Sequence, residues 1–189
     1  MGRLQHRTIP GASYFVTTDA WQRHSVFQVA ETAEIVTNRI LSCRERGAYL
    51  LQEFVLMPDH LHLLLTPAGN NALEKVMQLI KGGSSFEVHR KRGTSNPIWH
   101  SGFHESSIRD ADDFRSKLLY IRENPVKARL VQKFEEWPYG SGNSRFKMDA
   151  MPERYSSGAK APSASPKVGA KAPTPEKSLT LSHVAGRHS

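Results

Sequence analysis

The spacing of hydrophobic and polar residues divides the chain into strands and helices in a definite order. Apolar residues in alternating or continuous short runs predict strands, and apolar residues at helical spacing predict helices. The expected elements, in chain order, are a strand at 13–18, a helix at 29–46, strands at 50–57 and 60–66 joined by a Pro-Asp turn, a helix at 72–92 and a strand within 98–108.

A further helix is expected at 110–124, with apolar residues at 111, 114, 118 and 121. Acidic residues fill its first turn, where the helix dipole favours them, and Pro125 makes Asn124 the expected boundary. The complete order is then βαββαβα. This order predicts an α+β, ferredoxin-like fold, in which an antiparallel sheet is covered on one face and the strand at 60–66 is free to meet the last helix.

From about residue 147 the composition changes to Ala, Pro, Ser, Gly and Lys without apolar periodicity. We therefore expect a folded domain over 1–146 and a disordered basic tail over 147–189. The tail has seven basic and three acidic residues, so its net charge of +4 is half of the chain's +8. It is expected to act as a solvated linker or to add salt-sensitive, non-specific affinity for DNA.

The net charge of +8, from 26 basic and 18 acidic residues, favours a polyanionic partner. Basic residues on two of the predicted helices are either phosphate contacts or charges that solvate the helix faces. Trp99, Phe103 and Tyr14 either stack on unpaired bases or lie in the core. The candidate phosphate contacts are Lys81, Arg90, Lys91, Arg92, Arg115, Lys117, Arg122, Lys127 and Arg129.

No apolar run approaches the roughly 20 residues needed to cross a bilayer, and no signal peptide is recognisable near the start. We therefore expect a cytoplasmic protein with no membrane partner. The single cysteine, Cys43, excludes an intramolecular disulfide.

Two histidines, His60 and His62, stand at i and i+2 in an apolar segment. On a strand both imidazoles face the same side, which is the geometry of a two-ligand metal clamp. The same pair is also compatible with histidines that only complete a sheet, and the spacing does not decide between the two interpretations.

Tyr120 and Asn124 are at i and i+4 on the last predicted helix, so they share one face. Near two histidines, they suggest a nucleophile beside a metal whose third ligand is the amide. Alternatively, Tyr120 is a half-buried helix residue and Asn124 only ends the helix.

Five segments, taken in order and spacing, resemble the REP-associated tyrosine transposases, which belong to the HUH superfamily of single-strand DNA transposases and share an IS200-like domain. The resemblance extends from about Arg7 to about Ser144. It departs from the family at Arg129, where glycine is frequent, and at Gly140, where serine is expected. The segments are 14–17 (YFVT), 57–62 (MPDHLH), 99–103 (WHSGF), 120–128 (YIRENPVKA) and 137–139 (WPY).

The resemblance implies that His60 and His62 are metal ligands, Tyr120 is the nucleophile and Asn124 is a third polar ligand. It implies cleavage and rejoining of single-stranded DNA, at a hairpin or REP-type sequence, through a 5′-phosphotyrosine and a free 3′-OH. An oxygen-rich open site of this kind favours Mg²⁺ or Mn²⁺. A monomer and a homodimer both occur among such proteins, and the sequence does not choose between them.

Two other functions share some of these features. A DNA-binding protein that has lost cleavage is disfavoured by the intact set of His60, His62, Tyr120 and Asn124. A nucleotide hydrolase of the histidine-triad type would need a histidine at position 64, where the chain has Leu64.

Overall fold

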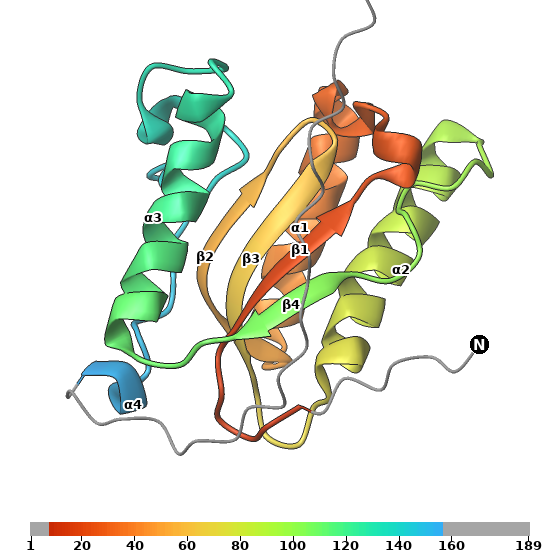
Figure 1. The fold of residues 1–189 in the computed structure, drawn as a ribbon. Helices are drawn as coiled ribbons and strands as arrows, with labels where there is room; N and C mark the ends of the chain where they lie inside the picture. Colours follow the sequence, from red (N-terminus) through yellow and green to blue (C-terminus); the bar gives the residue numbers. More distant parts are fainter. Residues whose placement is uncertain (1–7, 157–189) are drawn as a thin grey trace, which may run out of the picture.

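Four strands of the computed structural model pair into one antiparallel sheet, in the spatial order β2-β3-β1-β4 (Figure 1). The structure describes residues 8–156. Three short 3-10 helices join the longer elements, and the βαββαβα order and the ferredoxin-like fold are confirmed. The main elements are β1 (Tyr14–Asp19), α1 (Ala30–Glu45), β2 (Tyr49–Leu56), β3 (His60–Pro67), α2 (Leu73–Arg92), β4 (His104–Ser107), α3 (Ala111–Lys127) and α4 (Glu153–Ser156).

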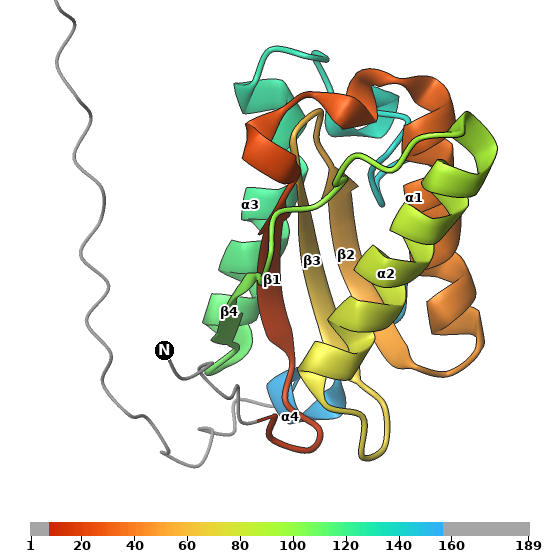
Figure 2. The same cartoon turned by 90° about the vertical axis from the view of Figure 1, so that its right-hand side faces the viewer.

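The two faces of the sheet carry different helices (Figure 2). Side chains alternate along a strand, so Val16, Leu61 and Leu63 point to one face, where they are fully buried with residues of α1 and α2. Leu64 points to the other face and packs in a second apolar cluster with Ile121 of α3. The closing helix therefore lies across the sheet from α1 and α2. None of the helices within residues 8–156 is long and apolar enough to cross a membrane.

Helix α3 continues one turn beyond the expected boundary. Its first turn is capped by Asp110, whose carboxylate accepts a hydrogen bond of 2.8 Å from the backbone N–H of Asp113. The expectation that it ends at Asn124 is wrong, because the helix runs to Lys127 with Pro125 inside it. The Pro125 ring is buried, and this packing offsets the single backbone hydrogen bond that proline removes so close to the end of the helix.

The expected start of disorder at residue 147 is also wrong, because residues 147–156 are ordered. Asp149 receives two hydrogen bonds of 2.7 Å from the Arg44 guanidinium and one of 2.7 Å from the backbone N–H of Leu51. Tyr155 is 2% exposed, and its hydroxyl accepts from the backbone N–H of Ser13. Asp149 and Tyr155 anchor this segment by hydrogen bonds, and the partly buried Met148 and Met151 pack against the two apolar clusters. The remainder of the expected tail, 157–189, lies outside the described residues.

Candidate active site

The two histidines of β3 lie on the face of the sheet that α3 partly covers. Leu61 between them is fully buried on the opposite face, as strand alternation requires. The imidazole centroids of His60 and His62 are 4.7 Å apart. The structure therefore brings the pair together in the arrangement expected for two ligands of one metal ion.

Each imidazole is held through Nδ1. The Nδ1–H of His60 donates to the Asp59 carboxylate at 2.6 Å, and Nδ1 of His62 lies 2.8 Å from the Thr17 hydroxyl. Partners at Nδ1 orient the rings and leave Nε2 as the nitrogen that could bind a metal, as second-shell hydrogen bonds do in metal sites. Thr17 pairs directly with His62 across the β1–β3 ladder, so the sheet register fixes this contact.

The Nε2 atom of His62 is buried and has no hydrogen-bond partner among the described residues. A buried polar atom without a partner is costly in a stable fold and calls for a physical explanation. Burial, with the nearby charges of His60 and Arg23, lowers the pKa of His62 from 6.5 to about 3. The imidazole is therefore neutral at physiological pH, with a lone pair available, which is the form that binds metals.

Tyr120 of α3 lies directly beside this pair. Its ring centroid is 5.3 Å from that of His62 and 5.6 Å from that of Phe15 on β1, in edge-to-face contact. The side chain is 45% exposed, so a substrate can reach its hydroxyl. Asn124 follows one helical turn later on the same face and is part-buried. The structure thus brings Tyr120 and the histidines of β3 into one site, from segments about 60 residues apart.

The donor set fits a divalent cation. Within residues 8–156 there is no group of three or more His, Cys, Asp and Glu residues that could hold a metal ion. His60 and His62 would therefore need an amide or substrate oxygen to complete the coordination, and Asn124 is the side-chain amide on the tyrosine face of α3. Two imidazoles with open positions filled by oxygen suit a metal that must also bind a phosphate.

The orientation of α3 is fixed on its other edge by an ion pair between a half-exposed arginine and a buried glutamate. Glu53 of β2 has a side chain that is only 1% exposed, and Arg122 donates to it at 3.1 and 3.0 Å. The Ser141 hydroxyl also donates to Glu53. Burial raises the pKa of Glu53, although its partners oppose this. Because successive helical residues are about 100° apart, Tyr120 and Arg122 flank the buried Ile121, and the pair holds the tyrosine edge over β3.

Arg122 is thus paired with Glu53, although its side chain is half exposed, and its role as a DNA contact stays a prediction. The two departures from the family also have local explanations. Arg129 adopts a φ of 57°, a left-handed conformation that glycine tolerates best. A Cβ at Gly140 would lie 3.2 Å from the Phe134 ring, and the neighbouring Ser141 supplies the hydroxyl that reaches Glu53.

Next to Tyr120, the same face of the sheet is uncovered. Helix α3 packs over β2 and β3, so Phe15 and Thr17 of β1 are part-exposed and His104 of β4 is exposed. The Lys117 ammonium lies 5.1 Å from the centroid of the Phe15 ring. Tyr120 also lines a groove of about 490 Å³ along the outer face of α3. A polymeric substrate therefore has access to the tyrosine from two sides.

The remaining basic candidates fall into two groups, carried by α3 and α2, and these helices lie on opposite faces of the sheet (Figure 2). The α3 group lies around the tyrosine and comprises Arg115, Lys117, Lys127 and Arg129. The α2 group lies across the sheet and comprises Lys81, Arg90, Lys91 and Arg92. The structure does not bring the two groups together, so only the α3 group is placed to contact a substrate at Tyr120.

Several of these cations already have partners. Lys127 pairs with Glu123 at 2.7 Å, and Arg115 with Asp112 at 3.0 Å. These pairs are exposed and weak, so a phosphate can displace them. Lys81 instead donates to the backbone carbonyls of His100 and Gly102, and burial lowers its pKa from 10.5 to about 8. Its position indicates a structural role.

Trp99 does not offer a surface for base stacking, which corrects the first of its two interpretations. It is 7% exposed, packs on Phe27 with centroids 4.6 Å apart, and donates from Nε1 to the Ser84 hydroxyl at 3.0 Å. Three aromatic residues with accessible rings were not predicted from the sequence: Trp21 and Phe86 are exposed, and Phe15 is part-exposed. For Phe15 a signal was available, because strand alternation places residue 15 on the same face as residue 17.

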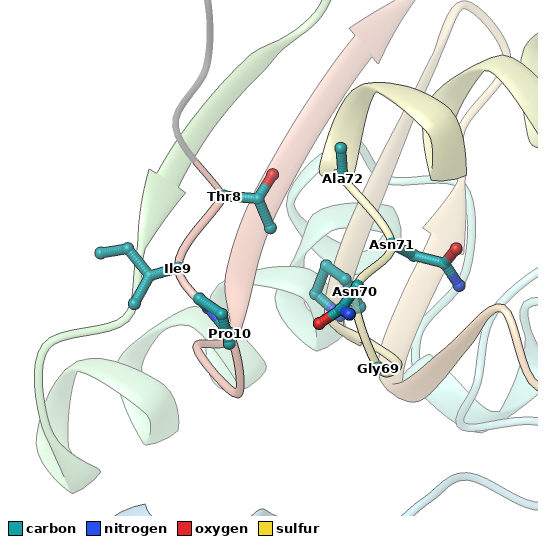
Figure 3. A pocket seen from close by; sticks show the side chains of 8 residues that line it. Thr8, Ile9, Pro10, Gly69, Asn70, Asn71 and Ala72 are labelled. Carbon is teal, nitrogen blue, oxygen red and sulfur yellow. The ribbon is translucent and has the colours of Figure 1, made fainter.

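A separate hollow of about 220 Å³ lies at the far end of β3 from the histidines (Figure 3). It is bounded by residues 8–10 and by the loop 69–72 before α2. Thr8 accepts a hydrogen bond of 2.8 Å from the backbone N–H of Leu73, which ties the two walls together. No residue predicted for the site lines this hollow.

Comparison with known proteins gives consistent matches. The family described as "Transposase IS200 like" matches residues 11–124. A Haemophilus influenzae protein assigned as a REP-associated tyrosine transposase is 32% identical over 110 residues, covering 53% of this chain and 62% of that relative. The REP-associated tyrosine transposase of Escherichia coli K12 is 25% identical over 142 residues, covering 75% of this chain and 82% of the relative.

Among solved structures, that of a REP-associated tyrosine transposase bound to a REP hairpin superposes with a TM-score of 0.62. It is 22% identical and covers 86% of this chain and all of that one. At this identity the match supports the fold.

Proposed function

Because the chain belongs to the IS200-like transposase family, we propose that it is a metal-dependent enzyme that cleaves and rejoins single-stranded DNA through Tyr120. The observation that carries the proposal is the contact between Tyr120 and His62, whose buried Nε2 has no other partner among the described residues. The hairpin-bound relative with the same fold suggests that the substrate is a hairpin of the REP type.

In the cleavage step the Tyr120 oxygen attacks a backbone phosphorus and forms a P–O bond with it. The bond from that phosphorus to the 3′ oxygen breaks. The phenol loses its proton to solvent and the departing oxygen takes one up, so the products are a 5′-phosphotyrosine and a 3′-OH. Rejoining reverses the step, because one ester bond has replaced another.

A phenol with an ordinary pKa near 10 is a weak nucleophile at neutral pH and needs assistance. His60 and His62 would hold Mg²⁺ or Mn²⁺ through Nε2, with Asn124 as a third ligand. When bound, the cation would polarise the phosphoryl group and offset the negative charge that builds up on it. The edge-to-face contacts with Phe15 and His62 hold the tyrosine ring on the side where the phosphate must lie.

The α3 group of basic residues gives the DNA backbone a favourable approach to the tyrosine. Arg115, Lys117, Lys127 and Arg129 lie on or just after the helix that carries Tyr120. Their contribution to affinity should decrease with increasing salt, because counterions are released from the phosphates on binding.

The test is to incubate the full chain with labelled hairpin DNAs from the neighbourhood of its gene, with Mg²⁺ or Mn²⁺ and with EDTA. A denaturing gel then reports any covalent protein–DNA adduct. We expect an adduct that requires metal and is absent in Tyr120→Phe, which should still bind the hairpin. Tight binding with no adduct under any metal would instead identify a DNA-binding protein that has lost cleavage. An adduct in Tyr120→Phe would show that another residue is the nucleophile.

A further inference from the structure

An exposed aromatic pair at the end of β1 has no role in the proposed chemistry. Trp21 is 37% exposed, and its ring stacks on that of His100, with centroids 6.2 Å apart and planes 25° from parallel. A single exposed aromatic residue is ordinary on a protein surface. Two stacked rings from different segments, next to a candidate active site, require a more specific explanation.

Backbone hydrogen bonds place this pair beside the candidate active site. Ala20 and Trp99 form an antiparallel bridge and are both buried, so their side chains point toward the core with α1 and α2. The backbone N–H of Trp21 donates to the carbonyl of Ile98 at 2.9 Å and that of His100 to the carbonyl of Asp19 at 2.9 Å, so the two residues lie side by side next to Asp19 at the end of β1. His60 pairs directly with Asp19, two residues before Trp21.

The turn that presents Trp21 is strained and firmly held. Gln22 and Arg23 have φ values of 52° and 58°, a left-handed conformation that residues other than glycine rarely adopt. Such residues persist only where the surroundings impose them, and they concentrate at functional sites. Here the Arg23 guanidinium contacts Asp19 at 2.5 Å and Asp59 at 2.9 Å, which ties the turn to the residue that orients His60.

The His100 side of the pair is equally fixed. Its backbone N–H donates to the carbonyl of Asp19 at 2.9 Å, and its own carbonyl accepts from the Lys81 ammonium at 2.9 Å. The ring Nδ1–H donates to the carbonyl of Ser101 at 2.8 Å. Both rings are thus preorganised, which reduces the entropy lost when a ligand stacks on them.

We propose that Trp21 and His100 form a stacking platform for an unpaired nucleobase of the strand whose phosphate enters the site at Tyr120. This inference rests on the proposed function and adds a binding subsite to it. Aromatic side chains that stack on bases are a general means of holding single strands, and every base has a face to offer. Arg23 pairs with both Asp19 and Asp59 and offsets part of their negative charge, which would otherwise repel a neighbouring phosphate more strongly.

The experiment measures the affinity of the full chain for a labelled hairpin with unpaired flanks, by fluorescence anisotropy in EDTA. Trp21→Ala should weaken binding between about fivefold and 150-fold, the range expected for one stacked base. An abasic site at one flanking position should weaken binding by the unaltered protein by a similar factor. The same abasic site should have little further effect on binding by Trp21→Ala. Trp21→Phe should retain most of the affinity, since it keeps an aromatic face.

The matched control is Phe86→Ala. Phe86 is 67% exposed on α2, across the sheet from the site, so its removal should leave affinity unchanged. The tryptophan emission of the unaltered protein should be quenched by the flanked hairpin, and this quenching should be largely lost in Trp21→Phe. That measurement decides the matter even if Trp21→Ala does not fold.

The outcomes separate the two proposals. If Trp21→Ala binds the flanked hairpin as tightly as the unaltered protein does, only the platform is overturned. The same follows if Trp21→Ala loses equal affinity for the bare stem, and if every abasic position weakens binding equally. A selective loss in Trp21→Ala without any covalent adduct would leave the platform standing and overturn the nuclease. No binding of hairpin DNA by the unaltered protein would overturn both.

Discussion

Removing the charge of Arg122 should destabilise the protein in a strongly pH-dependent manner. The variant Arg122→Met keeps the side-chain stem and removes the partner of Glu53, a carboxylate that is 1% exposed. Breaking a buried ion pair from one side generally costs about 3–5 kcal/mol. Because the Arg122 side chain is 49% exposed and partly screened by solvent, we expect a loss nearer 2–3 kcal/mol at pH 7.

The loss of stability in Arg122→Met also has an upper bound, because Glu53 can avoid being a buried unpaired charge by taking up a proton. For a carboxyl with an ordinary pKa of 4.5, protonation at pH 7 costs about 3.4 kcal/mol, and at pH 5 only about 0.7 kcal/mol. Burial raises the pKa of Glu53 in the folded state, so the folded protein binds this proton more readily than the unfolded chain. The deficit of Arg122→Met relative to the unaltered protein should therefore shrink as the pH falls toward 4.5.

Urea unfolding at pH 7 and pH 5 measures both quantities, and thermal unfolding at pH 7 should show a decrease in Tm of roughly 4–12 °C. The matched control is Arg115→Met on the same helix, whose ion pair with Asp112 is exposed and should contribute less than about 1 kcal/mol. Glu53→Gln combined with Arg122→Met should recover much of the lost stability, because no charge is left buried. A deficit that is the same at both pH values, or no larger than that of Arg115→Met, would refute the reasoning.

Three further outcomes are expected. His62→Ala should weaken Mn²⁺ binding at least tenfold by electron paramagnetic resonance titration, because it removes a proposed ligand; unchanged Mn²⁺ affinity would exclude it as a ligand. Asp149→Asn should cost roughly 1.5 kcal/mol at pH 7. The hydrogen bonds from Arg44 hold the pKa of Asp149 below its ordinary value of 3.8, so the stabilisation by Asp149 is present above that pH and is lost as the pH falls further. A series of urea unfolding measurements in which the two proteins differ by a constant free energy down to pH 2 would contradict this. Ending the chain after Ser156 should leave Tm nearly unchanged. Ending it after Phe146 should lower Tm by several degrees, since this removes Asp149 and Tyr155, which anchor residues 147–156. Equal Tm values for the two shortened chains would show that these anchors contribute nothing.

Patterns that depend on local periodicity were readable from the sequence. A period of two identified the strand that carries His60 and His62 and showed that both rings share a face. A period near 3.6 identified the helix of Tyr120 and placed Asn124 on its tyrosine side. These inferences needed only the geometry of one element, and for that reason they agree with the structure.

Periodicity gave no information where one or two side chains determine whether a segment is ordered or where a helix ends. Nothing around Asp149 or Tyr155 distinguishes them from a flexible tail, yet each reaches a partner about 100 or more residues away. Likewise, the burial of Pro125 allows α3 to run past the boundary that local preference predicted. Long-range packing overrode local preference at these points, because a buried hydrogen bond or ring outweighs a weak backbone bias.

The sequence by itself determined the order of the elements, the face of the histidine pair and the residue types available for metal binding and nucleophilic attack, since these follow from spacing along one chain segment. Only the tertiary structure decided how the cations are paired, because Arg122 and Lys81 contact partners that the sequence does not identify. Only it placed Trp99 in the core and left Trp21 exposed. Burial and pairing depend on which surfaces meet when the sheet and helices pack, and spacing along the chain carries no information about that contact.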